Sequence, residues 1–193
     1  MYKILCITDR KSCVEDFEEH IEKVSKSGVY GIILREKDLN ECEYQTIAKT
    51  IIPLCKNTKL MLHFNVEVAR NLHQKYVHIS FEIFSQKPQI VEAFDVVGVS
   101  IHSQEEAVLA EKMGANYIIA GHIFDTDCKK NIPPRGIEFL RDICQRVKIP
   151  VYAIGGITPQ NFKNVIEAGA FGVCLMSSMM KCENPKELVE KFK

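Results

Sequence analysis

Three side chains able to transfer protons or bind anions follow one short apolar segment. Residues 116–121, with the sequence NYIIAG, end at a glycine, and His122, Thr126 and Lys129 come soon after it. Histidine titrates near neutral pH, whereas a hydroxyl and an ammonium group both donate hydrogen bonds to anions. The pattern predicts that the loop after residues 116–121 is functional.

A second set of candidates consists of small residues that let backbone N–H groups approach an anion. Gly155 and Gly156 separate an apolar segment from an expected helix, and Ser177 and Ser178 follow another apolar segment. Backbone N–H groups at a helix N-terminus are suited to a phosphate group. A glycine pair is also an ordinary turn between a strand and a helix, so its place in the fold matters.

Apolar segments recur along the chain in a way that predicts alternating strands and helices. Between the strands lie amphipathic segments, and Thr158 followed by Pro159 predicts one helix start. Three amphipathic segments end at a glycine of the kind that stops a helix, namely 14–28, 103–115 and 158–170. The predicted strands are 3–8, 30–34, 59–64, 76–80, 95–100, 116–121, 151–156 and 171–177.

Eight strands that are apolar on nearly every residue favour a parallel sheet covered by helices. Their number favours a closed (β/α)8 TIM barrel over an open doubly wound sheet. The chain has 193 residues, which is short beside the ~250 of a typical barrel. We therefore expect a single compact TIM-barrel domain over residues 1–193, with short loops. In such barrels the function lies in the loops after the strands, and phosphate commonly binds after strands seven and eight.

The composition favours a small ligand over a polyanion or a membrane. Lys plus Arg and Asp plus Glu number 25 each, so no net field attracts nucleic acid. No segment has the ~18 apolar residues that span a bilayer, and the N-terminus lacks a signal-peptide core. The eight cysteines are scattered without metal-ligand spacing, and Cys6 and Cys174 lie in apolar segments. We expect a cytoplasmic protein with reduced thiols, no nucleic-acid or membrane partner and no bound metal; its oligomeric state stays open, a homo-oligomer included.

Four segments together resemble the thiamine phosphate synthase superfamily across nearly the whole chain. They read LREKDL at 34–39, VSIHSQEEA at 99–107, GHIFDTDCKK at 121–130 and AIGGITPQNFKNVIEAGAFGVCLMS at 153–177. Within the superfamily the chain is most similar to the TenI-type thiazole tautomerases. The resemblance implies one of two reactions. The synthase joins a pyrimidine diphosphate to a thiazole phosphate with Mg²⁺, whereas the tautomerase aromatises a carboxythiazole ethyl phosphate by moving a proton.

Three departures from the synthase pattern favour the tautomerase. Where the synthase has Asn-Asp, with the Asp on Mg²⁺, this chain has His63 and Phe64, and a phenyl ring cannot bind a cation that needs oxygen donors. The next metal-binding segment is replaced by SFEI, which leaves Glu82 and Ile83. The Gly-Pro-x-Phe segment of the synthase has become Gly-His-Ile-Phe, with His122 in place of proline. The resemblance thus implies an isomerase with no cofactor.

The resemblance also implies roles for individual residues. His122 is expected to be the catalytic acid and base, above the thiazole ring. Arg35 and Lys37 suit the substrate carboxylate, which a guanidinium group binds with two hydrogen bonds. Thr126 and Lys129 match the diphosphate-binding residues of the synthase. The other residues predicted to bind the thiazole phosphate are His63, Ser100, Gly155, Gly156, Met176, Ser177 and Ser178.

Other interpretations of the same residues stay open. His122 is also read as a hydrogen-bond partner of a neighbouring loop, and residues 35–37 as a solvated charge cluster. His63 is also read as a packing residue, while His20 and His73 are predicted on helix surfaces. Two other functions remain: a synthase with a relocated metal site, and a non-catalytic regulator that binds thiazole phosphate.

Overall fold

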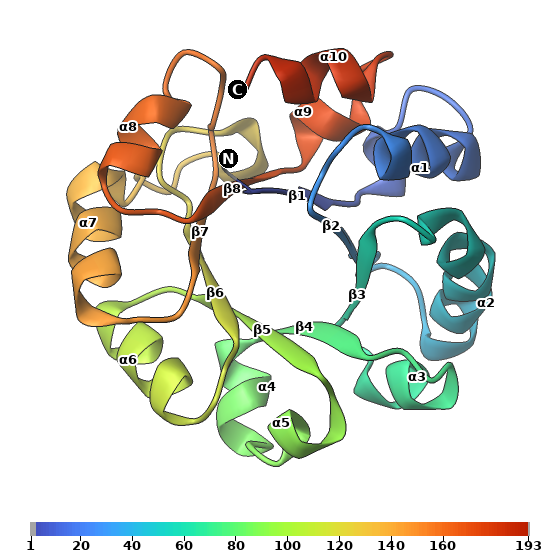
Figure 1. The fold of residues 1–193 in the computed structure, drawn as a ribbon, viewed down its shortest axis with the longest axis horizontal. Helices are drawn as coiled ribbons and strands as arrows, with labels where there is room; N and C mark the ends of the chain where they lie inside the picture. Colours follow the sequence, from blue (N-terminus) through green and yellow to red (C-terminus); the bar gives the residue numbers. More distant parts are fainter. Residues whose placement is uncertain (1–2, 193) are drawn as a thin grey trace. The chain divides into compact units, whose positions relative to one another are not determined.

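Eight parallel strands form a closed barrel in sequence order (Figure 1). This computed structural model describes residues 3–192. The closed barrel confirms the predicted (β/α)8 fold. The predicted strand ends differ most from the observed ones in the seventh and eighth strands. The strands are β1 (Lys3–Ile7), β2 (Gly31–Leu34), β3 (Lys59–His63), β4 (Tyr76–Ser80), β5 (Val96–Ile101), β6 (Tyr117–Gly121), β7 (Val151–Ile154) and β8 (Gly172–Leu175).

The three glycines predicted to stop helices do so. Gly28, Gly114 and Gly169 have φ values of 95°, 93° and 102°, a backbone conformation that favours glycine. The helices are α1 (Phe17–Lys26), α2 (Glu41–Ile51), α3 (Val66–Asn71), α4 (Phe81–Gln86), α5 (Ile90–Ala93), α6 (Gln104–Lys112), α7 (Gly136–Arg146), α8 (Phe162–Glu167), α9 (Ser177–Met180) and α10 (Pro185–Glu190), with short 3-10 turns η1 (Arg10–Ser12), η2 (Ile52–Cys55) and η3 (Asp127–Lys129).

The predicted helix start at Thr158 is wrong, because α8 begins only at Phe162. The side-chain oxygen of Asn161 accepts the Thr158 N–H at 2.8 Å, and residues 159–161 form a turn. Thr158 still contributes the first backbone acceptor, since its carbonyl accepts the Phe162 N–H at 3.0 Å. The local hydrogen bond of an Asn side chain thus displaces the start that the Thr-Pro pair predicts.

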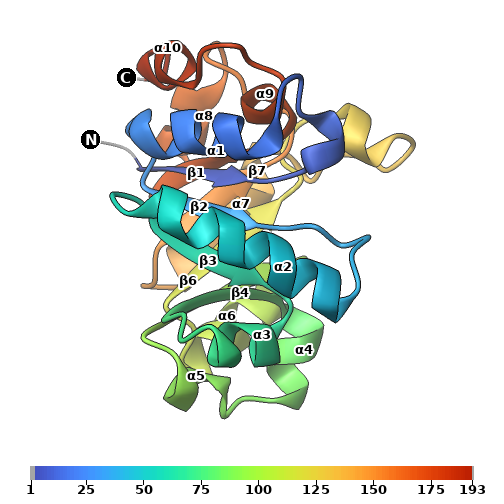
Figure 2. The same cartoon turned by 90° about the vertical axis from the view of Figure 1, so that its right-hand side faces the viewer.

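The chain divides into two compact units, each described here by itself. One holds Lys3–His78 and the chain from Leu175 onward, and the other holds Ile79–Cys174. In the first unit, Figure 2 shows α9 and α10 near α1. The prediction of a single domain stays a prediction.

Buried side chains fix the strand ends that carry candidate residues. In the first unit the Tyr44 hydroxyl donates to the Leu34 carbonyl at 2.6 Å and accepts the His63 N–H at 2.9 Å. This single side chain of α2 therefore ties the carboxyl ends of β2 and β3 together. Cys6 and Cys174 are buried, as expected of thiols that pack as small apolar side chains.

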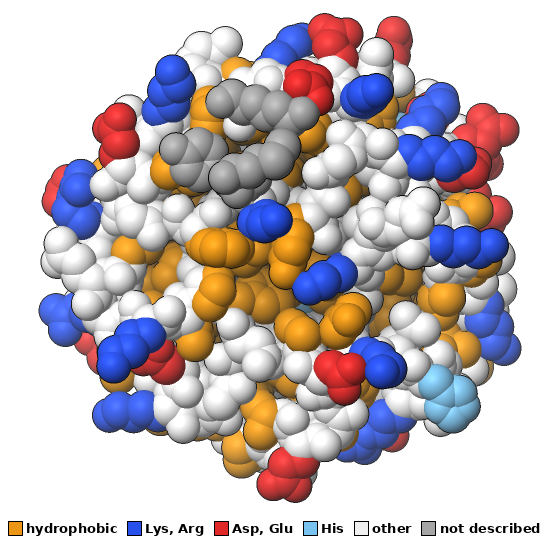
Figure 3. Space-filling view, in the orientation of Figure 1, with side chains coloured by type: hydrophobic (Ala, Val, Ile, Leu, Met, Phe, Trp, Pro, Cys, Tyr) orange, Lys and Arg blue, Asp and Glu red, His pale blue; other side chains and the backbone are white. Residues whose placement is uncertain are grey.

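Charge is mixed on the visible surface. On the face that Figure 3 shows, Lys and Arg side chains lie interspersed with Asp and Glu side chains. Within residues 3–192, no helix combines the length and the apolar character needed to cross a bilayer. The mixed surface charge agrees with the equal numbers of basic and acidic residues.

Candidate active site

His122 lies directly after β6 and is buried, with 4% of its surface exposed. Only glycine fits before it, since a Cβ at Gly121 would lie 2.5 Å from the backbone oxygen of Ile154. The Ile123 N–H donates to the Ile154 carbonyl at 2.9 Å, and the His122 carbonyl accepts the Arg135 N–H at 3.0 Å. These two bonds fix the start of the His122 loop, on one side to the end of β7 and on the other to Arg135, the residue before α7.

The hydrogen bond of the His122 ring determines the tautomer of its neutral form. Nε2 lies 3.1 Å from the Ile132 carbonyl oxygen, and a carbonyl only accepts, so Nε2 carries the hydrogen. Nδ1 is then the basic nitrogen. Among the described residues no fully buried side-chain nitrogen or oxygen lacks a partner. No partner of Nδ1 is found there, so this atom is not fully enclosed. The interpretation of His122 as a hydrogen-bond partner within its loop region is therefore supported for Nε2. Nδ1 takes no part in that bond, so it can still accept a proton.

Thr126 and Lys129 lie further along the same loop. The Thr126 hydroxyl oxygen accepts the Cys128 N–H at 3.4 Å and caps η3. Lys129 ends this short turn with its side chain exposed. The structure gives Thr126 a local role, and the anion-binding roles of both residues stay predictions.

Gly155 and Gly156 pack directly against the His122 loop. Their φ values are 101° and 63°. A Cβ at Gly155 would lie 2.3 Å from the His122 Cβ, and one at Gly156 would lie 2.3 Å from the Asp125 carbonyl oxygen. The pair is therefore needed to let two loops approach each other, a reason that the sequence interpretation did not include.

Replacing Gly156 with alanine is expected to lower the free energy of unfolding by about 1–3 kcal/mol, from a left-handed conformation and from overpacking against Asp125. Chemical denaturation measures this loss. Gly136→Ala is the matched control, because Gly136 has a φ of 81° with open space around it. It should show the conformational cost alone. Equal losses in the two variants would contradict the close approach of the loops.

Ser100 lies half-buried on β5, in register with Ile119 of β6. The role of Ser100 stays a prediction.

Within the unit that holds Ile79–Cys174, the structure brings His122 and the glycine pair together. The Thr126 hydroxyl is bonded to the Cys128 N–H of its own loop.

Arg35, Lys37 and His63 gather near the carboxyl ends of β2 and β3 in the first unit. Burial holds the pKa of His63 well below its usual range, and His78, Arg35 and Lys37 lower it further by charge repulsion. His63 is therefore neutral near pH 7. Arg35 follows β2 half-buried, and its N–H donates to the Thr8 hydroxyl at 2.9 Å. The two cationic side chains give this corner a positive field that suits an anion.

The interpretation of His63 as a packing residue has support. Its ring lies 5.9 Å from that of His78, at an interplanar angle of 24°. Burial lowers the pKa of His78 to about 3, so both stacked rings are neutral. His63 is 8% exposed, as a packing residue would be.

An ion-pair network that sequence reasoning missed lies beside Arg35. Glu36 is 4% exposed, and its carboxylate accepts from the Thr8 hydroxyl at 2.6 Å and from Arg10 Nη1 at 3.1 Å. Arg10 also makes two hydrogen bonds of 2.7 Å to Asp38. These bonds raise the pKa of Arg10 and lower the pKa of Asp38.

The network changes the interpretation of residues 35–37. A solvated charge cluster is wrong for Glu36, which is buried and paired. Because Arg10 takes both nearby carboxylates, the Arg35 guanidinium has no ion pair in the part of the chain that the structure describes. A half-buried cation of this kind is suited to an incoming carboxylate.

The residues after β3 and β4 do not fit the Mg²⁺ site that the resemblance implies for the synthase. Mg²⁺ needs oxygen donors in near-octahedral geometry. Phe64 offers none, and it lies 55% exposed with a φ of 71°. The Ser80 hydroxyl caps α4, and Glu82 is exposed in its first turn. Within residues 3–192 no three His, Cys, Asp or Glu side chains lie close enough together to hold a metal ion.

Met176, Ser177 and Ser178 form the turn after β8. Ser177 and Ser178 open α9, whose first backbone bond runs from the Met180 N–H to the Met176 carbonyl at 2.9 Å. The N–H groups of the two serines precede that bond, so they have no partner within the helix. Ser177 is half-buried and Ser178 exposed. The arrangement suits an anion, and phosphate binding here stays a prediction.

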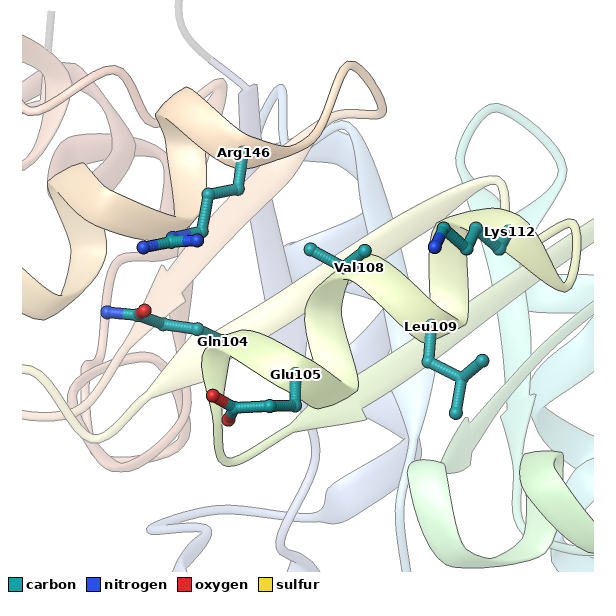
Figure 4. A pocket seen from close by; sticks show the side chains of 6 residues that line it. All are labelled: Gln104, Glu105, Val108, Leu109, Lys112 and Arg146. Atoms are coloured by element: carbon teal, nitrogen blue, oxygen red, sulfur yellow. The ribbon is translucent and has the colours of Figure 1, made fainter.

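A groove of about 310 Å³ on the outer helices of the second unit contains none of the candidate residues. Figure 4 shows Arg146 reaching from α7 toward the side chains of α6. The groove is lined by Gln104, Glu105, Val108, Leu109, Lys112 and Arg146. It has no part in the proposed chemistry.

Comparison with known proteins agrees with the resemblance. Residues 4–179 match the family model described as thiamine monophosphate synthase. The chain is 33% identical over 191 residues to the thiamine-phosphate synthase of Clostridium acetobutylicum, covering 96% of this chain and 90% of that protein. It is 36% identical over 182 residues to the thiamine-phosphate synthase of Bacillus licheniformis, covering 89% and 80%. The thiamine phosphate pyrophosphorylase of Pyrococcus furiosus has a TM-score of 0.84 at 30% identity, covering 99% of this chain and 93% of that chain.

These findings confirm the superfamily. The names of the relatives favour the synthase, the reaction held here as an alternative, over the tautomerase. A family match over most of the chain, together with identities above 30% across nearly its full length, shows where the chain belongs. It is a member of the thiamine monophosphate synthase family, a family of thiamine biosynthesis.

Proposed function

We propose that this chain is a thiazole tautomerase, which aromatises a carboxythiazole ethyl phosphate by proton transfer. The observation that carries the proposal is the His122 ring, whose Nε2 is bonded to the Ile132 carbonyl and whose Nδ1 is not fully enclosed. A fixed imidazole with one open nitrogen is suited to general acid–base catalysis. The absence of an oxygen donor at Phe64 is a second support, because the tautomerase needs no Mg²⁺.

The proposed reaction requires one proton to leave and one to arrive. His122 Nδ1 takes the proton from C2, the ring carbon that bears the carboxylate, and the electron pair moves through the diene to its far end. The imidazolium then returns a proton from Nδ1 to the exocyclic carbon, which restores neutral histidine and leaves an aromatic ring. The Ile132 carbonyl accepts from Nε2–H throughout and steadies the positive ring.

Other residues are proposed to bind the charged ends of the substrate. Arg35, with Lys37, holds the carboxylate and stabilises the negative charge that develops when C2 loses its proton. The N–H groups of Ser177 and Ser178 bind the phosphate. Each of these roles comes from the resemblance and the local geometry together.

Thiamine phosphate synthase is the second candidate, and the names of the relatives favour it. This reaction joins a pyrimidine diphosphate to a thiazole phosphate. It would require a metal site built from residues other than Phe64 and Glu82, because the synthase positions no longer carry the carboxylates that the resemblance implies. A non-catalytic regulator that binds thiazole phosphate is the remaining alternative.

One NMR time course distinguishes these functions. In EDTA, the dearomatised carboxythiazole phosphate is expected to convert to the aromatic product much faster with the protein than without it, and added Mg²⁺ should change the rate little. The same sample with pyrimidine diphosphate, thiazole phosphate and Mg²⁺ measures synthase activity, expected to be absent or trace. Conversion that collapses in EDTA and returns with Mg²⁺ would contradict the proposal. Binding without either reaction would favour the regulator.

A further inference from the structure

His20 lies on the inner face of α1, and its side chain is fully buried, at 0% exposure. The prediction of a surface position on a helix is therefore wrong for His20. His73 is exposed as predicted, but it lies in the turn after α3. The His20 ring has a partner on each nitrogen. Nδ1 lies 2.8 Å from Glu15 Oε1, and Nε2 lies 2.8 Å from the Met179 carbonyl oxygen. The ring thus bridges the segment before α1 and the helix α9, within one unit.

Both partners accept, so both ring nitrogens must donate. The Met179 carbonyl has no hydrogen to give, and Nε2 therefore carries one. Glu15 is also bonded to Lys23, and the hydrogen bonds of Lys23 and of His20 lower the pKa of this carboxyl. An ionised carboxylate accepts only, so Nδ1 carries a hydrogen as well. Accepting partners on both ring nitrogens are suited to the imidazolium form of His20.

We propose that the His20 imidazolium is a positioning residue that holds α9 in place for phosphate binding. By donating to the Met179 carbonyl it fixes the third residue of a four-residue helix, and with it the N–H groups of Ser177 and Ser178. The proposal rests on the proposed function in one respect, namely that this turn binds the substrate phosphate. A helix this short has little stability of its own, so its orientation depends on such contacts.

The surroundings of the bridge leave Glu15 as the charge partner of the ring. Lys23 is paired with the same carboxylate. The Cys182 thiol donates to the Met179 carbonyl at 3.1 Å, and burial raises its pKa, which keeps it a thiol. Cys13 is near both Cys182 and Lys23, Glu19 is near Lys23, and Cys6 is near Cys182. A neutral His20 ring would donate only once, and either Glu15 or Met179 would lose the hydrogen bond that His20 gives it.

The first test reads the protonation of the ring directly. In protein with ¹⁵N-labelled histidine at neutral pH, both nitrogens of His20 are expected to resonate as protonated nitrogens, and His20→Gln assigns the signal by removing it. In Glu15→Gln, which has a neutral partner and a half-exposed site, the doubly protonated fraction should fall. A single protonated nitrogen in the unaltered protein would overturn the proposal. This measurement involves no catalysis, so its result is independent of the proposed function.

The second test measures phosphate binding by calorimetry, with a thiazole ethyl phosphate and with the corresponding alcohol. His20→Gln and Glu15→Gln are expected to weaken binding of the phosphate roughly 5- to 30-fold, the loss expected when one charge-assisted hydrogen bond is weakened. Binding of the alcohol should not change. In kinetic assays the same loss should appear in KM with kcat nearly unchanged, because the chemistry at His122 is intact.

His73→Gln is the matched control, since it removes an exposed histidine from the same unit, and it should change neither binding constant. Thermal unfolding of each variant verifies that it is folded, and Glu15→Gln supplies the test if His20→Gln does not fold. Equal losses for phosphate and alcohol, or no loss for either, would overturn the positioning role. If the unaltered protein binds the thiazole phosphate no better than the alcohol, both the phosphate site at Ser177 and Ser178 and the positioning role of His20 are contradicted. The ¹⁵N spectrum still tests separately whether the His20 ring is doubly protonated.

Discussion

Replacing His122 with glutamine is expected to lower kcat by roughly 10²–10⁴-fold while KM changes little, as for loss of a general acid–base. The glutamine amide can still donate to the Ile132 carbonyl, so the loop keeps its bond. It cannot take a proton where Nδ1 stands. The loss corresponds to about 3–5 kcal/mol of barrier at 1.36 kcal/mol per decade. Because the aromatic product is favoured, the enzyme needs only to lower the barrier to proton transfer.

Initial rates of aromatisation, followed by NMR with saturating substrate, measure this effect. His73→Gln, an exposed histidine, should keep full activity. In D₂O the exocyclic carbon should gain deuterium, with some protium retained if one ring carries the proton from C2 to that carbon. Near-full activity of His122→Gln would move the acid–base elsewhere. Glu82 would then be the stronger candidate, because burial holds the pKa of His63 too low for an effective base.

The fold was predictable because its signals are local. Each glycine at 28, 114 and 169 has the positive φ that stops a helix, and the apolar segments between helices are long enough to identify as strands. The carboxyl ends of the strands were less predictable. Gly155 has a φ of 101°, so β7 ends before the glycine pair, although the apolar pattern alone continues through it.

The candidate residues were predictable by type, but their partners were not. A histidine after β6 and an arginine after β2 stand out in a barrel whose loops carry function. The bond from His122 Nε2 to the Ile132 carbonyl depends on how the loop folds back on itself, because the two residues lie ten positions apart. The burial of Glu36 depends on Thr8 and Arg10, which lie 28 and 26 residues earlier. Such long-range pairs leave no mark in a single sequence.

The burial of His20 had a local sequence signal, but neighbouring acidic residues suggested an exposed position. His20 lies four residues before Val24, and the two share the buried face of α1. The surrounding acidic residues, Glu18 and Glu19, give the segment the appearance of an exposed surface. Only the structure shows that Met179, more than 150 residues away, supplies a hydrogen-bond acceptor for the buried ring.

Replacing Arg35 with alanine is expected to lower kcat/KM by roughly 10²–10³-fold, the range observed when one donor to a developing negative charge is removed. KM should rise and kcat should fall together, because the guanidinium would hold the carboxylate in the ground state and stabilise it further as C2 loses its proton. The structure supports this size of effect. Arg35 is half-buried and has no ion pair among the described residues, whereas Arg10 beside it is paired to Glu36 and Asp38.

Steady-state rates on the carboxythiazole phosphate measure the effect. Two further variants test whether it depends on the guanidinium group and whether it is specific to Arg35. Arg35→Lys should recover only part of the loss, since an ammonium group keeps the charge but cannot bind a carboxylate with two parallel hydrogen bonds. Arg70→Ala removes an exposed arginine paired to Glu67 in the same unit, and it should leave the kinetics unchanged. If Arg35→Ala kept the kinetics of the unaltered protein, the carboxylate would be bound elsewhere. Lys37, the other cation that lowers the pKa of His63, would be the residue to replace next.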